Sequence, residues 1–418
     1  MFRLNIAFFV YEFPPYIVGG LGTYANYITR EFIKAGHDVT VFSMHKNDFP
    51  TRDIYKGVEV HRPIVRNINL GLLLPMFIPE EVRAWSKEGR AFFGEVFLYN
   101  ILSASKFVND LVRSEKREVD IVVSHDWLSS IGGILASNGV GKPFVFHIHS
   151  VEEGRTGDGS ETIKRLERIA ADQADRIITV SYAMRDQLVH LGYEEKKIRV
   201  VYNGIDVEKY SPDAVSEEER RRVRAKLGVR DDELMILFVG RLTWVKGADM
   251  LLQAMPQILR EVPNSKLVIV GVGDQQELLK NDVAKMGLED KVVLKFEFLQ
   301  EEEKIGYYAA SDICVFPSKY EPFGIVCTEA MAMGKPVVVG ARDISGLREQ
   351  VISSGEKQCG FHINPYDPSD IAKYASCLLL DKEMMMKFGK NARERVLEMF
   401  SWRKVSRDTL RIYQELMK

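Results

Sequence analysis

Short apolar runs alternate with amphipathic stretches from one end of the chain to the other. In the first half, the runs expected to form strands are Asn5–Val10, Val39–Ser43, Ile121–Ser124, Pro143–Ile148, Arg176–Val180 and Ile198–Tyr202. In the second half they are Met235–Val239, Lys266–Val270, Val292–Phe296, Ile313–Pro317 and Pro336–Gly340. Helical spacing marks Tyr24–Ala35, Ile163–Gln173, Ala248–Val262 and Glu329–Met333. Strands that alternate with helices predict α/β domains with parallel sheets and right-handed crossovers.

The pattern starts again in the middle of the chain. The first strand leads to the glycines of Gly19–Gly22, and Met235–Val239 leads to Gly240 and then to Lys246-Gly247. The polar stretch Asp206–Asp232 separates the two halves, and we interpret it as a linker followed by a solvated helix. A chain of 418 residues is too long for a single core, so two doubly wound domains are expected. We predict an N-terminal domain over 1–205, a C-terminal domain over 206–399 and a final helix over 400–418.

Charge and cysteine usage exclude some classes of function. The net charge of −2 gives no electrostatic case for nucleic-acid binding. Four cysteines without a C-x-x-C spacing predict neither disulfides nor a zinc site, and favour a reducing cytoplasm. No stretch has the length and apolarity of a membrane span. Leu70–Phe77 is the candidate for peripheral membrane contact, although an apolar segment that covers the N-terminal core is the favoured interpretation.

Two carboxylates stand eight positions apart in the segment Glu321–Glu329, which follows the strand expected at Ile313–Pro317. A helix that begins near Gly324 would present free backbone N–H groups and a positive dipole end, which bind anions. The eight residues from Glu321 to Glu329 would span about 12 Å at ~1.5 Å per residue. The two carboxylates could therefore accept hydroxyl donors at opposite ends of one ligand.

This segment resembles the E-x7-E signature of retaining glycosyltransferases that use nucleotide-sugars, in family 4 and its glycogen synthase relatives. The resemblance implies a GT-B fold, in which two Rossmann-like domains face a central cleft and the last helix crosses back onto the N-terminal domain. It also implies roles for individual residues. Glu321 would accept from a sugar hydroxyl beside the N–H groups of Phe323 and Gly324, the amides of Ile325 and Val326 would hold phosphate, and Glu329 would accept from the ribose hydroxyls. The alternative is an ordinary capped helix in an α/β domain.

Two cations follow the strand at Met235–Val239. Arg241 offers a bidentate fork to phosphate oxygens, and Lys246 offers a mobile point charge. Their segment resembles the G-R-x5-K-G motif of the same family. No D-x-D motif stands at a strand end, so we expect protein cations instead of a metal ion to neutralise a diphosphate leaving group, with no cofactor.

The N-terminal half carries further matches to the family. Gly19, Gly20 and Gly22 allow close backbone approach to a ligand and resemble the glycine loop that abuts the diphosphate and the transferred sugar. Bacterial glycogen synthases usually carry lysine where this chain has Ile17. By likeness to the T-x-H motif, His149 is expected near the sugar's 6-position, where it would support the reaction centre without abstracting a proton.

Two acidic residues are assigned to the acceptor side of the cleft. Asp126 lies in a segment that resembles the family's H-D-W motif, and its alternative role is a helix N-cap for the turn that begins at Trp127. Glu153 belongs to the polar loop after His149, which suits acceptor binding or a lid. The residues alone do not separate the roles of Glu152, Glu153 and Arg155.

These patterns favour a metal-independent retaining hexosyltransferase that transfers glucose from a nucleoside-diphosphate sugar to a glycan or sugar, as glycogen synthase does. A family 4 transferase for a small sugar, a sugar phosphate or a lipid-linked acceptor is the alternative within the class. A nucleotide-sugar epimerase on the same fold is the alternative from another class, and it would consume no acceptor. The residues leave the nucleotide base and the oligomeric state open.

Overall fold

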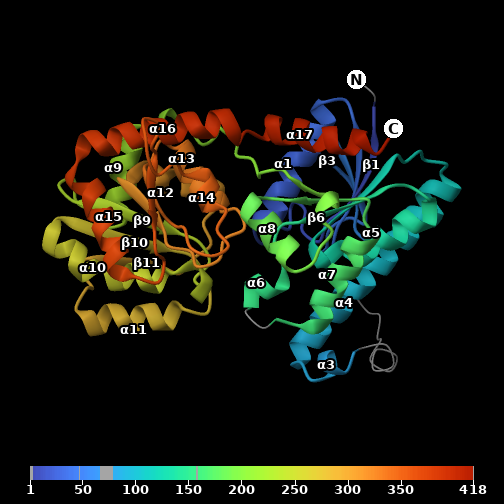
Figure 1. The fold of residues 1–418 in the computed structure, drawn as a ribbon, viewed down its shortest axis with the longest axis horizontal. Helices are drawn as coiled ribbons and strands as arrows, with labels where there is room; N and C mark the ends of the chain where they lie inside the picture. The colour runs from blue at the N-terminus through green and yellow to red at the C-terminus, as the bar shows by residue number, and fades with distance from the viewer. Residues whose placement is uncertain (1–2, 47, 66–78, 157–158, 418) are drawn as a thin grey trace. The chain divides into compact units, whose positions relative to one another are not determined.

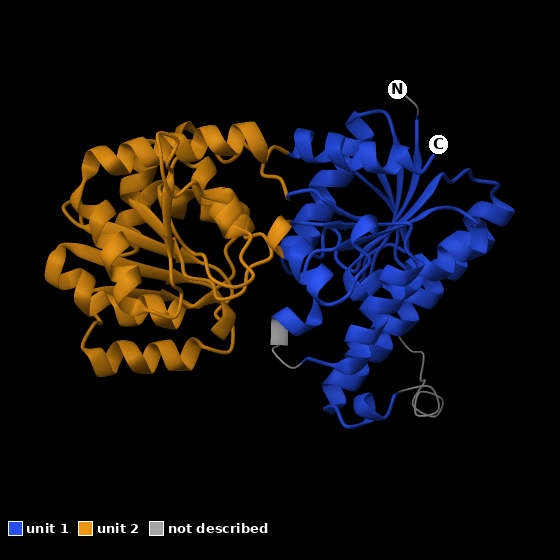
Figure 2. Ribbon diagram, in the orientation of Figure 1, with its two compact units in different colours: residues 1–180, 184–202, 402–418 blue, residues 181–183, 203–401 orange. Residues whose placement is uncertain are grey.

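A computed structural model describes residues 3–46, 48–65, 79–156 and 159–417. The chain forms two compact units (Figure 2). Unit 1 comprises Met1–Val180, Met184–Tyr202 and Trp402–Lys418, and unit 2 comprises Ser181–Ala183 and Asn203–Ser401. The segment Leu70–Phe77 lies outside the described residues. Within those residues, no helix is both long and apolar enough to cross a membrane.

Unit 1 is built on a sheet with the strand order β3-β4-β2-β1-β5-β6-β7-β8. All neighbouring strands are parallel except β3 and β4, which form an antiparallel hairpin. Lys56 and Gly57 join this hairpin with φ values of 49° and 86°, which are typical of a two-residue type I′ turn. The hairpin is missing from the predicted strands because Arg52–Tyr55 is a charged edge strand. The strands are β1 (Asn5–Phe9), β2 (Asp38–Phe42), β3 (Arg52–Tyr55), β4 (Val58–His61), β5 (Ile121–His125), β6 (Phe144–Ile148), β7 (Arg176–Thr179) and β8 (Ile198–Val200).

Helices cover both faces of this sheet (Figure 1). Ile6 and Phe8 of β1 pack in one cluster with α1 and α17, whereas the ring of Phe9 contacts Phe107 on the other face. The final helix belongs to this core, because Trp402 is buried and stacks on Tyr27 at 5.4 Å between ring centroids. The helical elements of unit 1 are α1 (Gly20–Lys34), α3 (Glu80–Arg83), α4 (Lys87–Ser105), η1 (Lys106–Ser114), α5 (Asp126–Val140), α6 (Glu152–Thr156), α7 (Glu161–Gln173), α8 (Tyr182–His190), whose first two residues group with unit 2, η2 (Glu195–Lys197) and α17 (Trp402–Glu415).

Unit 2 has a wholly parallel sheet with the strand order β11-β10-β9-β12-β13-β14. Numbered within the unit, this is the order 3-2-1-4-5-6 of a doubly wound Rossmann sheet. The strands are β9 (Leu234–Val239), β10 (Ser265–Val270), β11 (Val292–Lys295), β12 (Ile313–Phe316), β13 (Val337–Gly340) and β14 (Gly360–Ile363), of which β14 was not predicted. Two doubly wound α/β units are therefore present, as the sequence predicts.

The helices of unit 2 pack on both faces of its sheet. One face carries α10 and α15, which share a core cluster with β9, β10 and β12. The polar linker contains a helix with a capping box formed by Ser216 and Glu219, and none of its residues is buried. The helical elements are η3 (Pro212–Ala214), α9 (Glu217–Lys226), η4 (Trp244–Lys246), α10 (Ala248–Glu261), α11 (Gln276–Met286), α12 (Glu301–Ala310), α13 (Ile325–Ala332), α14 (Leu347–Gln350), α15 (Pro368–Leu380) and α16 (Lys382–Met399).

Candidate functional site

The strand order of unit 2 reverses between β9 and β12, which pair directly. Ligands of doubly wound sheets bind outside the carboxyl ends of the strands at such a switch point. The loops that leave β9 and β12 carry the two predicted cations and Glu321. The fold therefore gathers at one place residues that are up to 80 positions apart in sequence, Arg241 and Glu321.

Lys246 and Glu321 meet at this switch point. The ammonium nitrogen Nζ of Lys246 lies 2.5 Å from Oε2 of Glu321, and the two side chains are 17% and 11% exposed. Gly247 makes this close approach of the loops feasible, because its φ is +72° and a Cβ there would lie 2.1 Å from the carbonyl oxygen of Pro317. The pair is thus held by backbone packing as well as by charge.

Arg241 differs from Lys246 in its surroundings. Its residue is exposed, and within the described part of the chain its guanidinium makes no hydrogen bond or ion pair. A guanidinium in this state keeps its donors available to an anion such as a diphosphate. The predicted pair of cations is therefore one engaged ammonium and one guanidinium that has no partner in the described part of the chain.

The helix α13 begins where the sequence predicts a helix N-terminus. Gly324 is its N-cap with φ +85°, and a Cβ there would lie 2.6 Å from a methyl group of Leu347. Phe323 is buried, and its carbonyl oxygen accepts from Nε2 of Gln350 at 2.5 Å. Ile325 and Val326 form the half-buried first turn, where backbone N–H groups have no partner within the helix.

Glu329 is enclosed by donors that the sequence did not reveal. Its Oε1 accepts from the hydroxyl of Tyr210 at 3.1 Å and from Nζ of Lys304 at 2.6 Å, and its Oε2 accepts from the hydroxyl of Tyr308 at 2.8 Å. The residue is 2% exposed. Burial, with the charge of Glu329 adding to it, raises the pKa of Tyr308 well above its ordinary value, so the phenol stays protonated and can donate. Glu329 is therefore a buried carboxylate that already accepts from three donors.

In unit 1 the strand order reverses between β1 and β5. Oε2 of Glu12, just after β1, accepts from the backbone N–H groups of Val18 at 2.9 Å and Gly19 at 3.0 Å. Gly19 is the N-cap of α1, Gly20 is exposed, and Gly22 is buried so close to Glu12 that a Cβ would lie 3.1 Å from Oε2. Part of the glycine loop therefore binds the chain's own carboxylate.

Burial raises the pKa of Glu12, while the backbone hydrogen bonds from Val18, Gly19 and Gly22 oppose this shift and the charge of Asp126 reinforces it. Sequence reasoning missed Glu12. The available signal was an acidic residue that directly follows an apolar strand and precedes a glycine loop.

Asp126 joins the ends of two neighbouring strands. It is the first residue of α5, with φ +52°, and it is 6% exposed. Its Oδ1 accepts from the backbone N–H of His149 at 2.8 Å. His125, not Asp126, is the N-cap residue of α5, so the alternative role as a helix cap is wrong. The strained backbone and the hydrogen bond position the chain immediately after β6.

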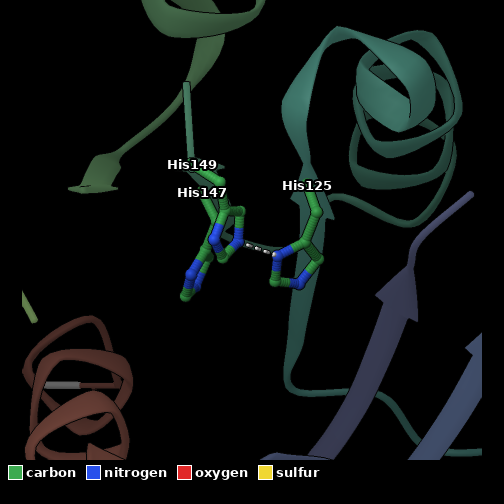
Figure 3. A group of neighbouring side chains, drawn as sticks. All are labelled: His125, His147 and His149. Carbon is green, nitrogen blue, oxygen red and sulfur yellow. Dashed lines mark hydrogen bonds between the residues drawn. The ribbon is translucent and has the colours of Figure 1, made fainter. Parts of the chain in front are cut away.

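Three histidines, His125, His147 and His149, lie close together, as Figure 3 shows. Nδ1 of His125 lies 3.1 Å from Nε2 of His149, and Nε2 of His147 lies 2.9 Å from the hydroxyl of Tyr413. Burial lowers the pKa of both His125 and His147 well below the ordinary value, and the neighbouring imidazoles lower it further, so both rings are neutral. Ligand atoms of the three rings lie within 4.8 Å of one another, so this cluster could hold a metal ion.

His149 itself is half-buried, and the edge contact of its ring with Tyr24 spans 4.6 Å between centroids. Glu153 is exposed on α6, whereas its neighbour Glu152 is buried and accepts from the backbone N–H of Ser160 at 3.2 Å. The two glutamates are therefore distinguished by their surroundings, which the sequence left open.

Comparison with known proteins identifies the family. Residues 18–209 match the model described as Glycosyltransferase Family 4, and residues 219–395 match the one described as Glycosyl transferases group 1. An uncharacterized glycosyltransferase of Methanocaldococcus jannaschii is 34% identical and aligns over 99% of each chain. Glycogen synthase of Mycobacterium tuberculosis is 29% identical over 98% of this chain and 94% of its own.

Among solved structures, sucrose-phosphate synthase from Thermosynechococcus elongatus matches with a TM-score of 0.78 and 24% identity over 99% of each chain. This likeness, with the two doubly wound units, confirms the predicted GT-B fold. Together with the relative that is 34% identical along its whole length, these findings show that the chain belongs to glycosyltransferase family 4.

Proposed function

We propose that the protein is a retaining glycosyltransferase that transfers glucose from a nucleoside-diphosphate sugar to a glycan, as a glycogen synthase does. The observation that carries this proposal is the group at the switch point of unit 2. An ammonium, a guanidinium without a partner among the described residues and the amino end of a helix lie there with a carboxylate. This combination suits a ligand with a diphosphate beside a hydroxyl-rich sugar.

The cations and the helix would stabilise the leaving group. As the glycosidic bond breaks, negative charge develops on the diphosphate, and donors fixed in advance are the most effective way to stabilise it. Arg241 would take two phosphate oxygens, Lys246 a third, and the amides of Ile325 and Val326 would complete the contacts. We expect no metal ion to be needed, and activity that survives EDTA would support this expectation.

The carboxylates would hold the donor at both ends. Glu321 would accept from a hydroxyl of the sugar, next to the N–H groups of Phe323 and Gly324, while its Oε2 accepts from the ammonium of Lys246. Glu329 would accept from the ribose, using the lone pair on Oε2 that Tyr308 leaves over. Neither carboxylate acts as a nucleophile in this proposal.

Unit 1 would supply the remaining contacts. Gly19, Gly20 and Gly22 would lie against the diphosphate and the transferred sugar, and His149 would contact the sugar near its 6-position. Asp126 and Glu153 would serve the acceptor, Asp126 chiefly by positioning the backbone of His149. Four free cysteines support a reducing cytoplasm as the location of the reaction.

The proposed reaction is a front-face substitution. The acceptor hydroxyl oxygen forms a bond to the anomeric carbon as the bond from that carbon to the phosphate oxygen breaks. The proton of the hydroxyl passes to the departing phosphate on the same face, so the anomeric configuration is retained. Closure that excludes water would protect the donor from hydrolysis.

A phosphorylated small molecule is the second candidate acceptor. Relatives about 30% identical include a D-inositol 3-phosphate glycosyltransferase of Streptomyces bingchenggensis and an alpha-maltose-1-phosphate synthase of Mycolicibacterium smegmatis. Their names favour a sugar-phosphate or inositol-phosphate acceptor over a polymer. Ile17, where bacterial glycogen synthases usually have lysine, points in the same direction.

A donor and acceptor panel tests the proposal. The protein is incubated with UDP-, ADP- and GDP-sugars, each with glycogen, glucose 1-phosphate, inositol 3-phosphate or no acceptor, and nucleoside diphosphate release is measured. Release that requires glycogen, with an α-linked product by NMR, supports the first candidate. Release that requires a phosphorylated acceptor supports the second, and an isomerised donor without release would establish an epimerase.

A further inference from the structure

The hydrogen bond between His125 and His149 links the tautomers of the two imidazole rings. Only one hydrogen fits between Nδ1 of His125 and Nε2 of His149, which are 3.1 Å apart. One of the two nitrogens must carry that hydrogen and the other must accept it. Figure 3 shows this hydrogen bond, through which the tautomer of one ring determines the tautomer of the other.

The surroundings of His125 decide which nitrogen is the donor. His125 is fully buried, and its Nε2 has no hydrogen-bond partner among the described residues. The rings of Phe8 and His147 lie 4.3 and 4.5 Å away and are inclined by only 37° and 39°, so an N–H in the plane of His125 does not point at either face. A buried N–H without an acceptor costs more than a bare lone pair. These surroundings favour a proton on Nδ1 of His125 and a bare lone pair on its Nε2.

We infer that His125 is a positioning residue, which donates its Nδ1 proton to Nε2 of His149 and thereby holds His149 in the tautomer protonated at Nδ1. His149 then carries an N–H donor at Nδ1 instead of a basic lone pair. Asp126 fixes the same residue through its backbone N–H. The tautomer follows from contacts within unit 1 alone. Its use, donation to an oxygen of the transferred sugar, rests on the proposed function.

The same contacts argue against a metal ion in the histidine cluster. His147 uses Nε2 toward the hydroxyl of Tyr413 at 2.9 Å and Nδ1 toward the hydroxyl of Tyr24 at 3.4 Å. Ligation would cost one of these hydrogen bonds and the bond between His125 and His149. A metal ion would therefore have to replace hydrogen bonds that the three rings already make.

NMR of the whole 15N-labelled protein tests the tautomer directly. The imidazole signals of His149 are identified by their loss in His149→Ala, and their 15N shifts show which nitrogen is protonated. We expect Nδ1 protonated and Nε2 unprotonated. In His125→Asn the amide nitrogen takes the place of Nδ1 and should preserve this pattern, whereas His125→Phe should leave a mixture of tautomers.

Tyr413→Phe is the matched control, because it removes a buried hydrogen bond from the same cluster without touching His125 or His149. It should lower the melting temperature but leave the shifts of His149 unchanged. A wild-type His149 protonated at Nε2, or an unchanged pattern in His125→Phe, would overturn the inference. So would stoichiometric binding of Zn²⁺ that shifts the signals of all three histidines.

Steady-state kinetics of the His125 variants show whether the positioning role and the proposed function hold independently of each other. With UDP-glucose, His125→Phe should lower kcat about tenfold with little change in KM, and His125→Asn should restore most of it. Equal rates for the two variants would contradict the positioning role. If the protein turns over no nucleotide-sugar, the proposed function fails while the NMR result still decides the tautomer.

Discussion

Lys246 and Arg241 stand in different surroundings, and this difference separates their contributions to stability and to activity. Lys246 is paired with a carboxylate that is 11% exposed, so its removal leaves a nearly buried charge without a partner. The loss of one partner from a buried pair is strongly destabilising. Arg241 is exposed and has no partner among the described residues, so its removal should cost no stability.

The first prediction compares Arg241→Ala with Lys246→Ala. Both should lower kcat about 100-fold or more, the effect of losing one donor to a developing oxyanion. Only Lys246→Ala should also lower the melting temperature. Lys280→Ala, an exposed cation on α11, serves as the control for both measurements. A near-normal rate in either variant would remove that residue from the proposed site.

The second prediction concerns Glu12 and pH. Burial raises its folded-state pKa above the ordinary 4.5, so between these two values the folded state binds a proton that the unfolded state has lost. The free energy of unfolding of the wild type therefore falls as pH rises from 4.5 through the raised folded-state pKa of Glu12. Glu12→Gln keeps an acceptor for Val18 and Gly19 but has no such proton.

Urea unfolding of both proteins from pH 4 to pH 8 measures this effect. The variant should gain stability relative to the wild type by about 1.4 kcal/mol for each pH unit between the two pKa values. If the difference in unfolding free energy between the two proteins stays constant over this range, burial does not raise the pKa of Glu12.

At the scale of the elements, glycines decide how closely the loops at the switch point pack. Gly247 and Gly287 both have φ near +65°, at +72° and +63°, but only Gly247 lies against backbone. The third prediction is that Gly287→Ala costs about 1–2 kcal/mol of unfolding free energy, the conformational cost alone. Gly247→Ala should cost about 1–3 kcal/mol more, because the carbonyl of Pro317 must move.

Activity distinguishes the two glycine variants further. The shift at Pro317 should displace Lys246 relative to Glu321 and lower turnover, whereas Gly287→Ala should leave turnover unchanged. Equal stabilities for the two variants, measured by chemical denaturation, would mean that the loops can separate at no cost.

The sequence predicted the buried elements well because strands covered on both faces are continuous apolar runs. The runs at Ile121–Ser124 and Met235–Val239 became β5 and β9 within one residue at each end. The exposed hairpin of β3 and β4 lacks such a run. The roles of Lys246 and Glu321 could be predicted from the sequence because each residue belongs to a local motif beside a strand. Tyr210, one of the three donors to Glu329, lies in a polar linker 119 positions away, and no local pattern marks it.

At the scale of the whole molecule, the helix α17 completes the core of unit 1. Trp402 is 5% exposed and packs against Tyr24 and Tyr27 of α1. The fourth prediction is that Trp402→Ala lowers the unfolding free energy of unit 1 by about 3–5 kcal/mol. Leu380→Ala, whose leucine is 65% exposed, should change stability by no more than about 0.5 kcal/mol.

Calorimetry measures the loss of stability, and limited proteolysis with trypsin shows which of the two units has unfolded. Cleavage in Trp402→Ala should begin within unit 1 while unit 2 still resists. Simultaneous loss of both units would show that they unfold as one cooperative body, and no change would show that the tryptophan is dispensable to the core.

The chain leaves unit 1 after Tyr202 and returns to it at Trp402, and the two crossings run side by side where Ile205 bonds to the carbonyl of Phe400 at 2.7 Å. This connectivity sets an order of events during synthesis. Unit 2 has all its residues once position 401 has emerged from the ribosome, but unit 1, although begun first, must wait for its closing helix. The nascent protein therefore carries an unfinished amino-terminal half for most of its translation, and that half is where chaperones would be needed.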